Sequence, residues 1–226
     1  MNFLRKVQVL LWKEIKSELR AKEMLSAMLV FSLLVVVAFG FALDDLDKDV
    51  LPKILPGVIW VTLTFAGILG LNRSFVAEQQ NDCLYGLMLC PADRSTIYVA
   101  KTIMNLLLMA IVELIAVPLF FIMFNANPPL NIGLFILILA LGTYCFMAVG
   151  TFLSALAAGT RSSEILLPIL MIPMISPVLI CAVQVTKVLF AAQTMVGTSP
   201  FINLLVVYAI LFTVLPLILF DYLLEV

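Results

Sequence analysis

The chain has 226 residues, of which 64% are apolar and 12% are charged, whereas soluble domains are about half apolar. This composition excludes an ordinary soluble domain and predicts an integral membrane protein. The formal net charge is −1, so the chain has no basic field for nucleic acid and we expect no such partner.

Missing residue types exclude several classes of enzyme. The chain contains no histidine, which rules out histidine-based metalloproteases, Ser-His-Asp triads and histidine ligation of haem iron. The dipeptide Gly-Lys never occurs, so there is no P-loop for ATP. We therefore predict no catalytic residue, no metal site and no enzyme activity of the chain alone. We expect reduced, structural thiols at Cys83, Cys90, Cys145 and Cys181, which form no C-x-x-C pair.

Residues 1–23 predict an amphipathic helix at the membrane interface. Apolar side chains recur there at helical spacing, and lysines and arginines occupy the opposite side. Such a helix lies in the headgroup plane with its basic face toward anionic lipid, although a charged leader that only sets topology would look similar. The apolar positions are Leu4, Val7, Leu11, Ile15 and Leu19.

Residues 24–226 contain six stretches long enough to cross a bilayer, which needs about 20 mostly apolar residues per helix. The third and fourth exceed that length, so we expect tilt or extension beyond the lipid. The predicted fold is an all-α bundle of six transmembrane helices. The spans are 24–43, 50–72, 97–124, 130–158, 165–184 and 201–222.

The lysines and arginines in the loops predict the orientation, because cytoplasmic loops retain the excess of these residues. With the N-terminus inside, ten of the thirteen lie on the cytoplasmic side, and only Lys48, Lys53 and Lys187 lie outside. Both termini and the loop 72–96 are then cytoplasmic. The stretch 185–200 becomes an external loop, too short to cross, with room for one or two interfacial or re-entrant helices. The ten are Arg5, Lys6, Lys13, Lys16, Arg20, Lys22, Arg73, Arg94, Lys101 and Arg161.

Glu113 lies near the middle of the third span, where an ionised carboxylate is expensive. One interpretation is a functional contact with a proton or a substrate. The other is a structural hydrogen bond to a neighbour such as Asn105, or to a backbone group across a helix interface.

The fourth and fifth spans carry the residues that shape helices. Three prolines in the fifth span predict a kink, used either for packing alone or because the helix faces protein or a cavity. A stripe of small residues in the fourth span predicts close helix packing. The prolines are Pro168, Pro173 and Pro177, and the small residues are Gly150, Ser154 and Ala158.

The cytoplasmic loop 72–96 contains a short amphipathic segment. Leu84, Leu87 and Met88 recur at helical spacing, and Pro91 ends the segment. Its apolar face has no evident partner within the chain, so we expect it to contact another protein, unless it rests on the membrane surface.

Several stretches together resemble the CcmB family, the permease subunits of the haem-handling ABC transporter of cytochrome c maturation. The resemblance covers nearly the whole chain and the order of the six spans, although no single motif is diagnostic. The stretches are LPGVIWV at 55–61, Arg73-x-Phe75, LMLxP at 87–91, Ala100-Lys101 and the proline-rich LLPILMIPMISPV.

The resemblance implies an ABC exporter permease with a CcmA-like ATPase beneath it. CcmC-like and CcmD-like membrane subunits and a CcmE-like haem chaperone, released at the outer face, complete the assembly. The loop would be the coupling helix that sits in the ATPase. It departs from the family pattern G-x-L-E-x-L, because Asp82 and Tyr85 replace the glycine and glutamate. The implied coupling residues are Arg73, Phe75, Glu78, Asp82, Leu84, Leu87 and Pro91.

We therefore expect a bacterial inner-membrane subunit driven by ATP on the partner, with haem held by partner subunits and no cofactor on this chain. It would pair with a second copy or another membrane subunit. Three alternatives stay open: an ABC exporter of lipid or polysaccharide, a non-transporting scaffold, and a proton-coupled carrier dependent on Glu113.

Overall fold

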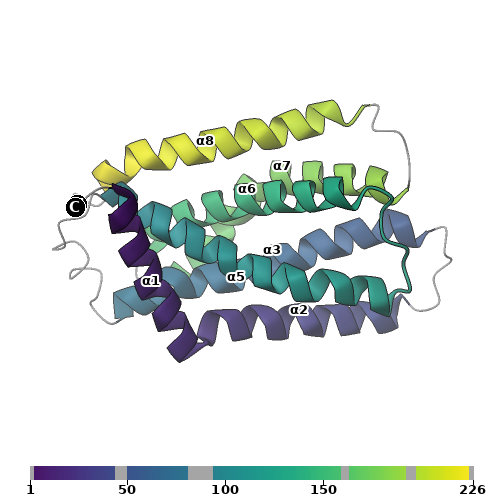
Figure 1. Cartoon of the computed structure of the whole chain (residues 1–226), viewed down its shortest axis with the longest axis horizontal. Coiled ribbons are helices and arrows are strands. Elements are labelled where there is room, and N and C mark those ends of the chain that lie inside the picture. Colours follow the sequence, from purple (N-terminus) through teal and green to yellow (C-terminus); the bar gives the residue numbers. More distant parts are fainter. Residues whose placement is uncertain (1–2, 44–49, 81–93, 159–162, 192–196, 224–226) are drawn as a thin grey trace.

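The computed structural model describes residues 3–43, 50–80, 94–158, 163–191 and 197–223, and all of its regular structure is α-helical. Six of the helices run roughly lengthwise, and α1 crosses one end of the bundle (Figure 1). The helices are α1 (Phe3–Ala21), α2 (Glu23–Ala42), α3 (Leu51–Gln80), α5 (Arg94–Met123), α6 (Ile132–Ala158), α7 (Ser163–Phe190) and α8 (Ser199–Leu223).

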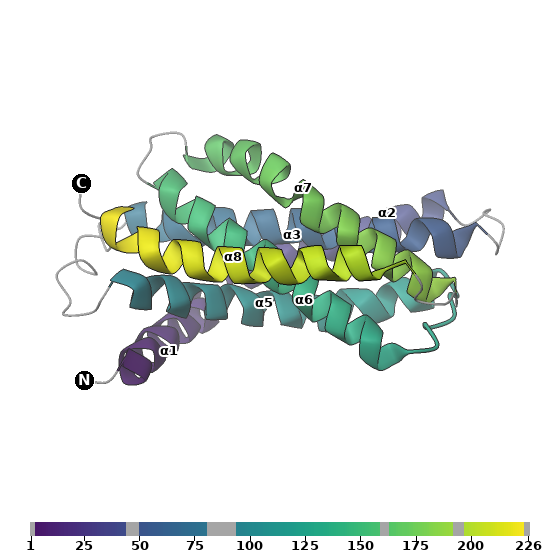
Figure 2. The ribbon, with the colours of Figure 1, turned by 90° about the horizontal axis from the view of Figure 1, so that it is seen from above.

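The six long helices α2, α3, α5, α6, α7 and α8 each contain an apolar stretch of at least 20 residues, enough to cross a bilayer. This confirms the predicted all-α fold with six spans. Because the number of spans is even, the first residues of α1 and the last residues of α8 lie at the same end of the molecule (Figure 2).

Several helices extend beyond their predicted ends. Helix α7 continues to Phe190 and α8 begins at Ser199, so the predicted loop 185–200 is wrong for residues 185–190 and 199–200. Val185 and Leu189 are buried there, whereas Lys187 faces outward. Tertiary packing keeps the helix intact past the polar residues that seemed to end it. Likewise α3 reaches Gln80 and α5 starts at Arg94, so only the middle of the predicted loop 72–96 lies outside helices described here.

Helices α3 and α6 approach each other closely at glycines. A Cβ added at Gly142 would lie 2.3 Å from the Trp60 ring, and one at Gly150 would lie 2.3 Å from Leu71 Cδ1. Ser154 is also buried. The close packing predicted for this face of the fourth span is therefore confirmed at Gly150 and Ser154, because a larger residue would push the two helices apart.

Helix α7 stays helical through its three prolines but changes direction along its length (Figure 2). Pro177 cannot donate a hydrogen bond to the carbonyl of Pro173, one helical turn earlier. The Ser176 hydroxyl donates to that carbonyl instead, at 2.9 Å. Tyr208 of α8 donates to the neighbouring Met174 carbonyl at 3.2 Å. Protein groups therefore satisfy the carbonyl that Pro177 leaves without its usual backbone donor.

Helix α1 packs on the bundle through the middle of its apolar face. Val7 is buried, and Leu11 and Ile15 pack against the core. Leu4 and Leu19, at the two ends of the predicted face, are 78% and 68% exposed. The apolar stripe thus meets both the bundle and the surroundings, rather than lipid alone.

Candidate functional site

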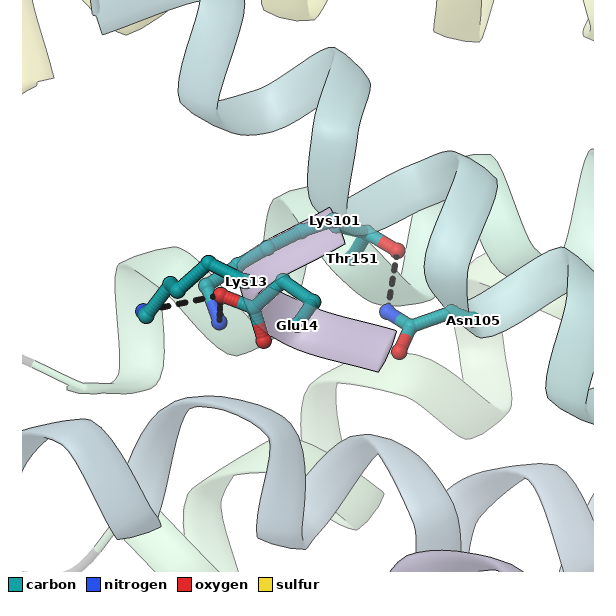
Figure 3. A network of polar contacts seen from close by, with 5 residues as sticks. All are labelled: Lys13, Glu14, Lys101, Asn105 and Thr151. Carbon is teal, nitrogen blue, oxygen red and sulfur yellow. Dashed lines mark hydrogen bonds and ion pairs between the residues drawn. The ribbon is translucent and has the colours of Figure 1, made fainter. Parts of the chain in front are cut away.

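The candidate site is the end of the bundle where α1 crosses the start of α5. Lys101, on α5, is 1% exposed, which makes it one of the most completely buried large side chains described. Its Nζ lies 3.6 Å from Oε1 of Glu14 on α1 (Figure 3). The same carboxylate oxygen also accepts a hydrogen bond from the exposed Lys13 at 3.1 Å.

The acidic and basic side chains of α1 lie in different environments. Glu14 turns toward the bundle, and Glu18 accepts a hydrogen bond from the Leu25 backbone N–H at 2.9 Å. Arg5, Lys16 and Arg20 are exposed, with Lys16 over the ring of Trp12 at 4.9 Å. The exposed surface of α1 therefore carries basic side chains beside apolar ones such as Leu4 and Leu19, and both acids of α1 contact other parts of the chain.

A buried ion pair of this kind stabilises the contact between two helices only when both charged partners are present. Removing one partner from a buried pair leaves an uncompensated charge and generally costs about 3–5 kcal/mol. The Glu14 carboxylate is a counter-charge for the buried ammonium group of Lys101.

Two further polar contacts continue along the same face of α5, toward α6. Asn105 Nδ2 donates to Thr151 Oγ1 at 3.0 Å (Figure 3), and Thr143 donates its hydroxyl to the Glu113 carboxylate. The α5 partners are eight residues apart and so are the α6 partners, in opposite directions, as antiparallel helices require. These contacts define the register of α5 against α6.

The structure gives Glu113 a hydrogen-bond partner, while a functional role for this residue stays a prediction. Glu113 is buried, and its hydrogen bond crosses a helix interface, as one of the two interpretations required. The suggested partner was wrong, because Asn105 lies two helical turns away along α5 and bonds to Thr151. Sequence spacing places Asn105 and Glu113 on one face, but it does not reveal which helix lies opposite.

The predicted coupling residues are only partly covered by the structure. Arg73, near the end of α3, forms an exposed ion pair with Glu23 of α2 at 3.1 Å, and such pairs contribute about 0–1 kcal/mol. Phe75 and Glu78 belong to the backbone of α3 rather than to a loop. Outside the described residues lie Asp82, Leu84, Leu87 and Pro91.

The sequence analysis places Lys101 within the third span and on the cytoplasmic side, but it does not predict that the side chain is buried. In the structure Lys101 lies inside α5 and is buried. A signal was available, because Lys101, Asn105 and Glu113 repeat at intervals of four and eight residues. That repeat marks one face of a helix carrying polar groups into the interior.

A cavity of about 330 Å³ lies at the opposite end of the bundle, between the ends of α2, α3, α5 and α7. Phe124, Phe190 and Leu55 line it together with the amides Asn125 and Asn127. None of the described residues that line it is ionisable. Elsewhere in the described part of the chain, no cluster of histidine, cysteine or acidic side chains suits a metal ion, and Cys145 and Cys181 are free and buried.

Comparison with known proteins places the chain in a family. The model of the CcmB protein family matches residues 5–222. Proteins called heme exporter protein B are similar along most of their length. The one from Rhodobacter capsulatus is 26% identical, over 80% of this chain and 82% of the relative. The one from Pseudomonas aeruginosa is 28% identical over 76% of each chain, and the one from Haemophilus influenzae is 27% identical over 77% and 78%. This multi-pass membrane protein therefore belongs to the CcmB family.

Proposed function

We propose that the chain is the transmembrane permease subunit of an ABC-type haem exporter that serves cytochrome c maturation. The observation that carries the proposal is the family match over residues 5–222, together with relatives named for haem export and a bundle of six apolar helices. The absence of histidine and of a P-loop from the sequence supports a non-catalytic role. ATP would be hydrolysed by a separate CcmA-like subunit.

The ATPase would dock at the end of the bundle where α1 crosses α5. By the distribution of lysine and arginine this end is cytoplasmic, so both termini face the cytoplasm of a bacterium across its inner membrane. The docking segment would comprise the end of α3 and the residues that follow it. It contains Arg73, Phe75, Glu78, Asp82, Leu84, Leu87 and Pro91.

Haem itself would be held by partner subunits rather than by this chain. Without histidine, the chain has no imidazole ligand for iron, and methionine here serves mainly as apolar core, as Met28 and Met147 do. CcmC-like and CcmD-like subunits and a CcmE-like chaperone would supply the haem chemistry at the outer face. A second copy of the chain, or another membrane subunit, would complete the transmembrane part of the transporter.

An exporter of lipid or polysaccharide is the competing transport function. A cavity for an anionic headgroup needs basic lining residues. In the described spans the buried cation is Lys101, which already contacts Glu14. The haem-exporter proposal is therefore favoured.

The test is copurification of the neighbouring ATPase with the full chain, followed by ATP hydrolysis in detergent. The wild type is compared with Leu84→Asp/Leu87→Asp. Leu130→Asp is the control, because Leu130 is 87% exposed and precedes α6 at the opposite end of the bundle. We expect binding and stimulated hydrolysis in the wild type and the control, and loss of both in the double variant. If no ATPase binds the wild type, or the double variant binds it equally well, the permease proposal fails in favour of a scaffold or a carrier.

A further inference from the structure

We infer that Tyr98 is a positioning residue that joins the first turns of α5 to a hinge of α8 at Pro216. This inference rests on the proposed function and adds a route to it. Movement of α5 at the ATPase-facing end reaches the last turns of α8 through the Tyr98 hydroxyl.

The first step of the argument is the interruption of α8 by Pro216, which lies inside the helix. Proline has no backbone N–H, so Pro216 cannot donate to the carbonyl of Phe212, one turn earlier. Phe212 is buried. Inside a membrane protein such a carbonyl is satisfied by neighbouring helices, hydroxyl side chains or ordered water. Helix α8 therefore lacks one of its own hydrogen bonds at this turn, which is where it can bend.

The second step is the donor that α5 supplies. The Tyr98 hydroxyl donates to the Phe212 carbonyl at 3.0 Å and also lies 3.2 Å from the Ala148 carbonyl of α6. A hydroxyl carries one hydrogen to donate. The Ala148 carbonyl lies inside α6, where the backbone N–H of Phe152 is in position to donate to it. The Phe212 carbonyl has lost the corresponding donor, so its contact with Tyr98 is the more important of the two.

The third step is the difference between the two sides of Pro216. Just before the proline, the Tyr144 hydroxyl of α6 lies 2.5 Å from Oγ1 of Thr213. Just after it, Ile218 and Leu219 are 60% and 40% exposed. Because α8 is held by α5 and α6 before Pro216 and is less covered after it, the last turns are the part that moves when the helix bends.

The fourth step is the position of Tyr98 along α5. It lies four residues after Arg94, where α5 begins, which is roughly 6 Å at 1.5 Å per residue. The segment proposed to dock on the ATPase includes Pro91, only three residues before Arg94. The last residues of α8 lie at the same end of the molecule (Figure 2). A displacement of the docking segment therefore reaches Tyr98 within about two helical turns of chain.

The experiment uses the full chain in complex with its ATPase subunit in lipid nanodiscs. Tyr98→Phe removes the hydroxyl and keeps the ring. Pro216→Ala returns a backbone N–H that can donate to the Phe212 carbonyl. The two single variants and their double variant form a cycle with the wild type. Tyr98 has other contacts as well, but Tyr98→Phe affects them in both backgrounds, so their contribution cancels in the cycle.

Tyr144→Phe is the matched control, made with and without Pro216→Ala. It also removes a tyrosine hydroxyl that faces α8. Its partner, however, is the side chain of Thr213, which itself donates to the Ala209 carbonyl at 2.5 Å. The readouts are the unfolding midpoint of the chain in mixed micelles, the amount of ATPase bound, the stimulation of ATP hydrolysis, and nucleotide-dependent hydrogen exchange of the amides of residues 217–223.

We expect Tyr98→Phe to lower the unfolding midpoint in the native sequence and to change it little in the Pro216→Ala background. All variants should bind the ATPase as the wild type does. Tyr98→Phe and Pro216→Ala should each lose about fivefold in stimulated hydrolysis, the lower end of the range for coupling between sites. The exchange response of residues 217–223 should disappear in both. Tyr144→Phe should shift the midpoint equally in the two backgrounds and keep the stimulation and the exchange response.

Two results would overturn the inference. An equal loss of midpoint from Tyr98→Phe in both backgrounds would show that the hydroxyl does not serve the Phe212 carbonyl. Full stimulation and an unchanged exchange response in Pro216→Ala would show that the contact only supports packing. If Pro216→Ala is not monodisperse, Tyr98→Phe is compared with Tyr144→Phe, and equal stimulation in the two overturns the inference. A wild-type chain that binds no ATPase refutes the proposed function, and this inference falls with it.

Discussion

The hydrogen bond between Thr143 and Glu113 can be removed with little change in side-chain size. Thr143→Val replaces the hydroxyl by a methyl group of similar volume, so the packing of α6 on α5 should be kept. The Glu113 carboxylate, 8% exposed, then loses the donor described for it. An unsatisfied buried polar group costs about 1–3 kcal/mol, whereas interhelical hydrogen bonds in membranes contribute about 0.6 kcal/mol on average and about 1.7 at most. We expect a loss of about 1–2 kcal/mol in the free energy of unfolding.

The assay is reversible unfolding in mixed micelles of four proteins: wild type, Thr143→Val, Glu113→Leu and the double variant. In this cycle, the second substitution should cost less once the first has been made, because neither residue retains its partner. We expect a coupling energy of about 1 kcal/mol. Losses that add within about 0.3 kcal/mol would refute the reasoning, since they would mean that the two side chains do not stabilise each other.

The same position separates a structural role from proton coupling. Glutamine keeps a hydrogen-bond acceptor of the same length, so Glu113→Gln should retain both the interface and cytochrome c maturation in cells. A proton-coupled carrier would instead stop working, because an amide cannot exchange a proton as a carboxyl does. If maturation is lost while folding and ATPase binding stay normal, Glu113 takes part in the mechanism and does not only support the packing of α5.

Two further changes probe the contacts of α3. Gly150→Ala should lower the free energy of unfolding by about 1–3 kcal/mol, because its Cβ would lie 2.3 Å from Leu71 Cδ1 and the site would be overpacked. Gly57→Ala is the control: a Cβ there would have no atom within 4 Å. It should raise the free energy of unfolding by about 0.5–1 kcal/mol. Similar effects at both glycines in mixed-micelle unfolding would contradict this packing. Trp60→Phe removes a 2.9 Å hydrogen bond to the Thr186 hydroxyl and should cost about 1–3 kcal/mol in the same assay; an unchanged unfolding free energy would show that this contact is dispensable.

The ends of the helices show where sequence-based prediction was weakest. Hydropathy locates the lipid-crossing part of each span, and all six were found in this way. It does not locate the end of the helix, because a helix that packs on its neighbours continues beyond the apolar stretch. Residues 185–190 of α7 illustrate this, since Val185 and Leu189 are buried although Gln184 and Lys187 interrupt the pattern.

Lys101 shows that the sequence also does not tell whether a charged side chain near the end of a span is exposed or buried. Counting lysines and arginines treats each as a label for one side of the membrane, which is valid where the side chain reaches water. Whether a lysine at the edge of a span is exposed depends on what covers it. Here the cover is α1, and its counter-charge, Glu14, lies 87 residues earlier in the chain. The spacing of Lys101 to Asn105 and Glu113 suggests an inward-facing side chain, but no local pattern identifies Glu14 as the residue that contacts it.

The sequence by itself determined the class of the protein, the number and order of its spans, the amphipathic character of its first helix and its family. The family follows from a resemblance to known sequences, and the other properties follow from composition and from repeats within one helix, which are local and therefore visible along the chain. Only the tertiary structure decided which polar groups meet: Glu14 with Lys101, Asn105 with Thr151, and Glu113 with Thr143. The physical reason is that these buried polar groups are satisfied by partners on other helices, and the packing of the whole bundle decides which helix that is.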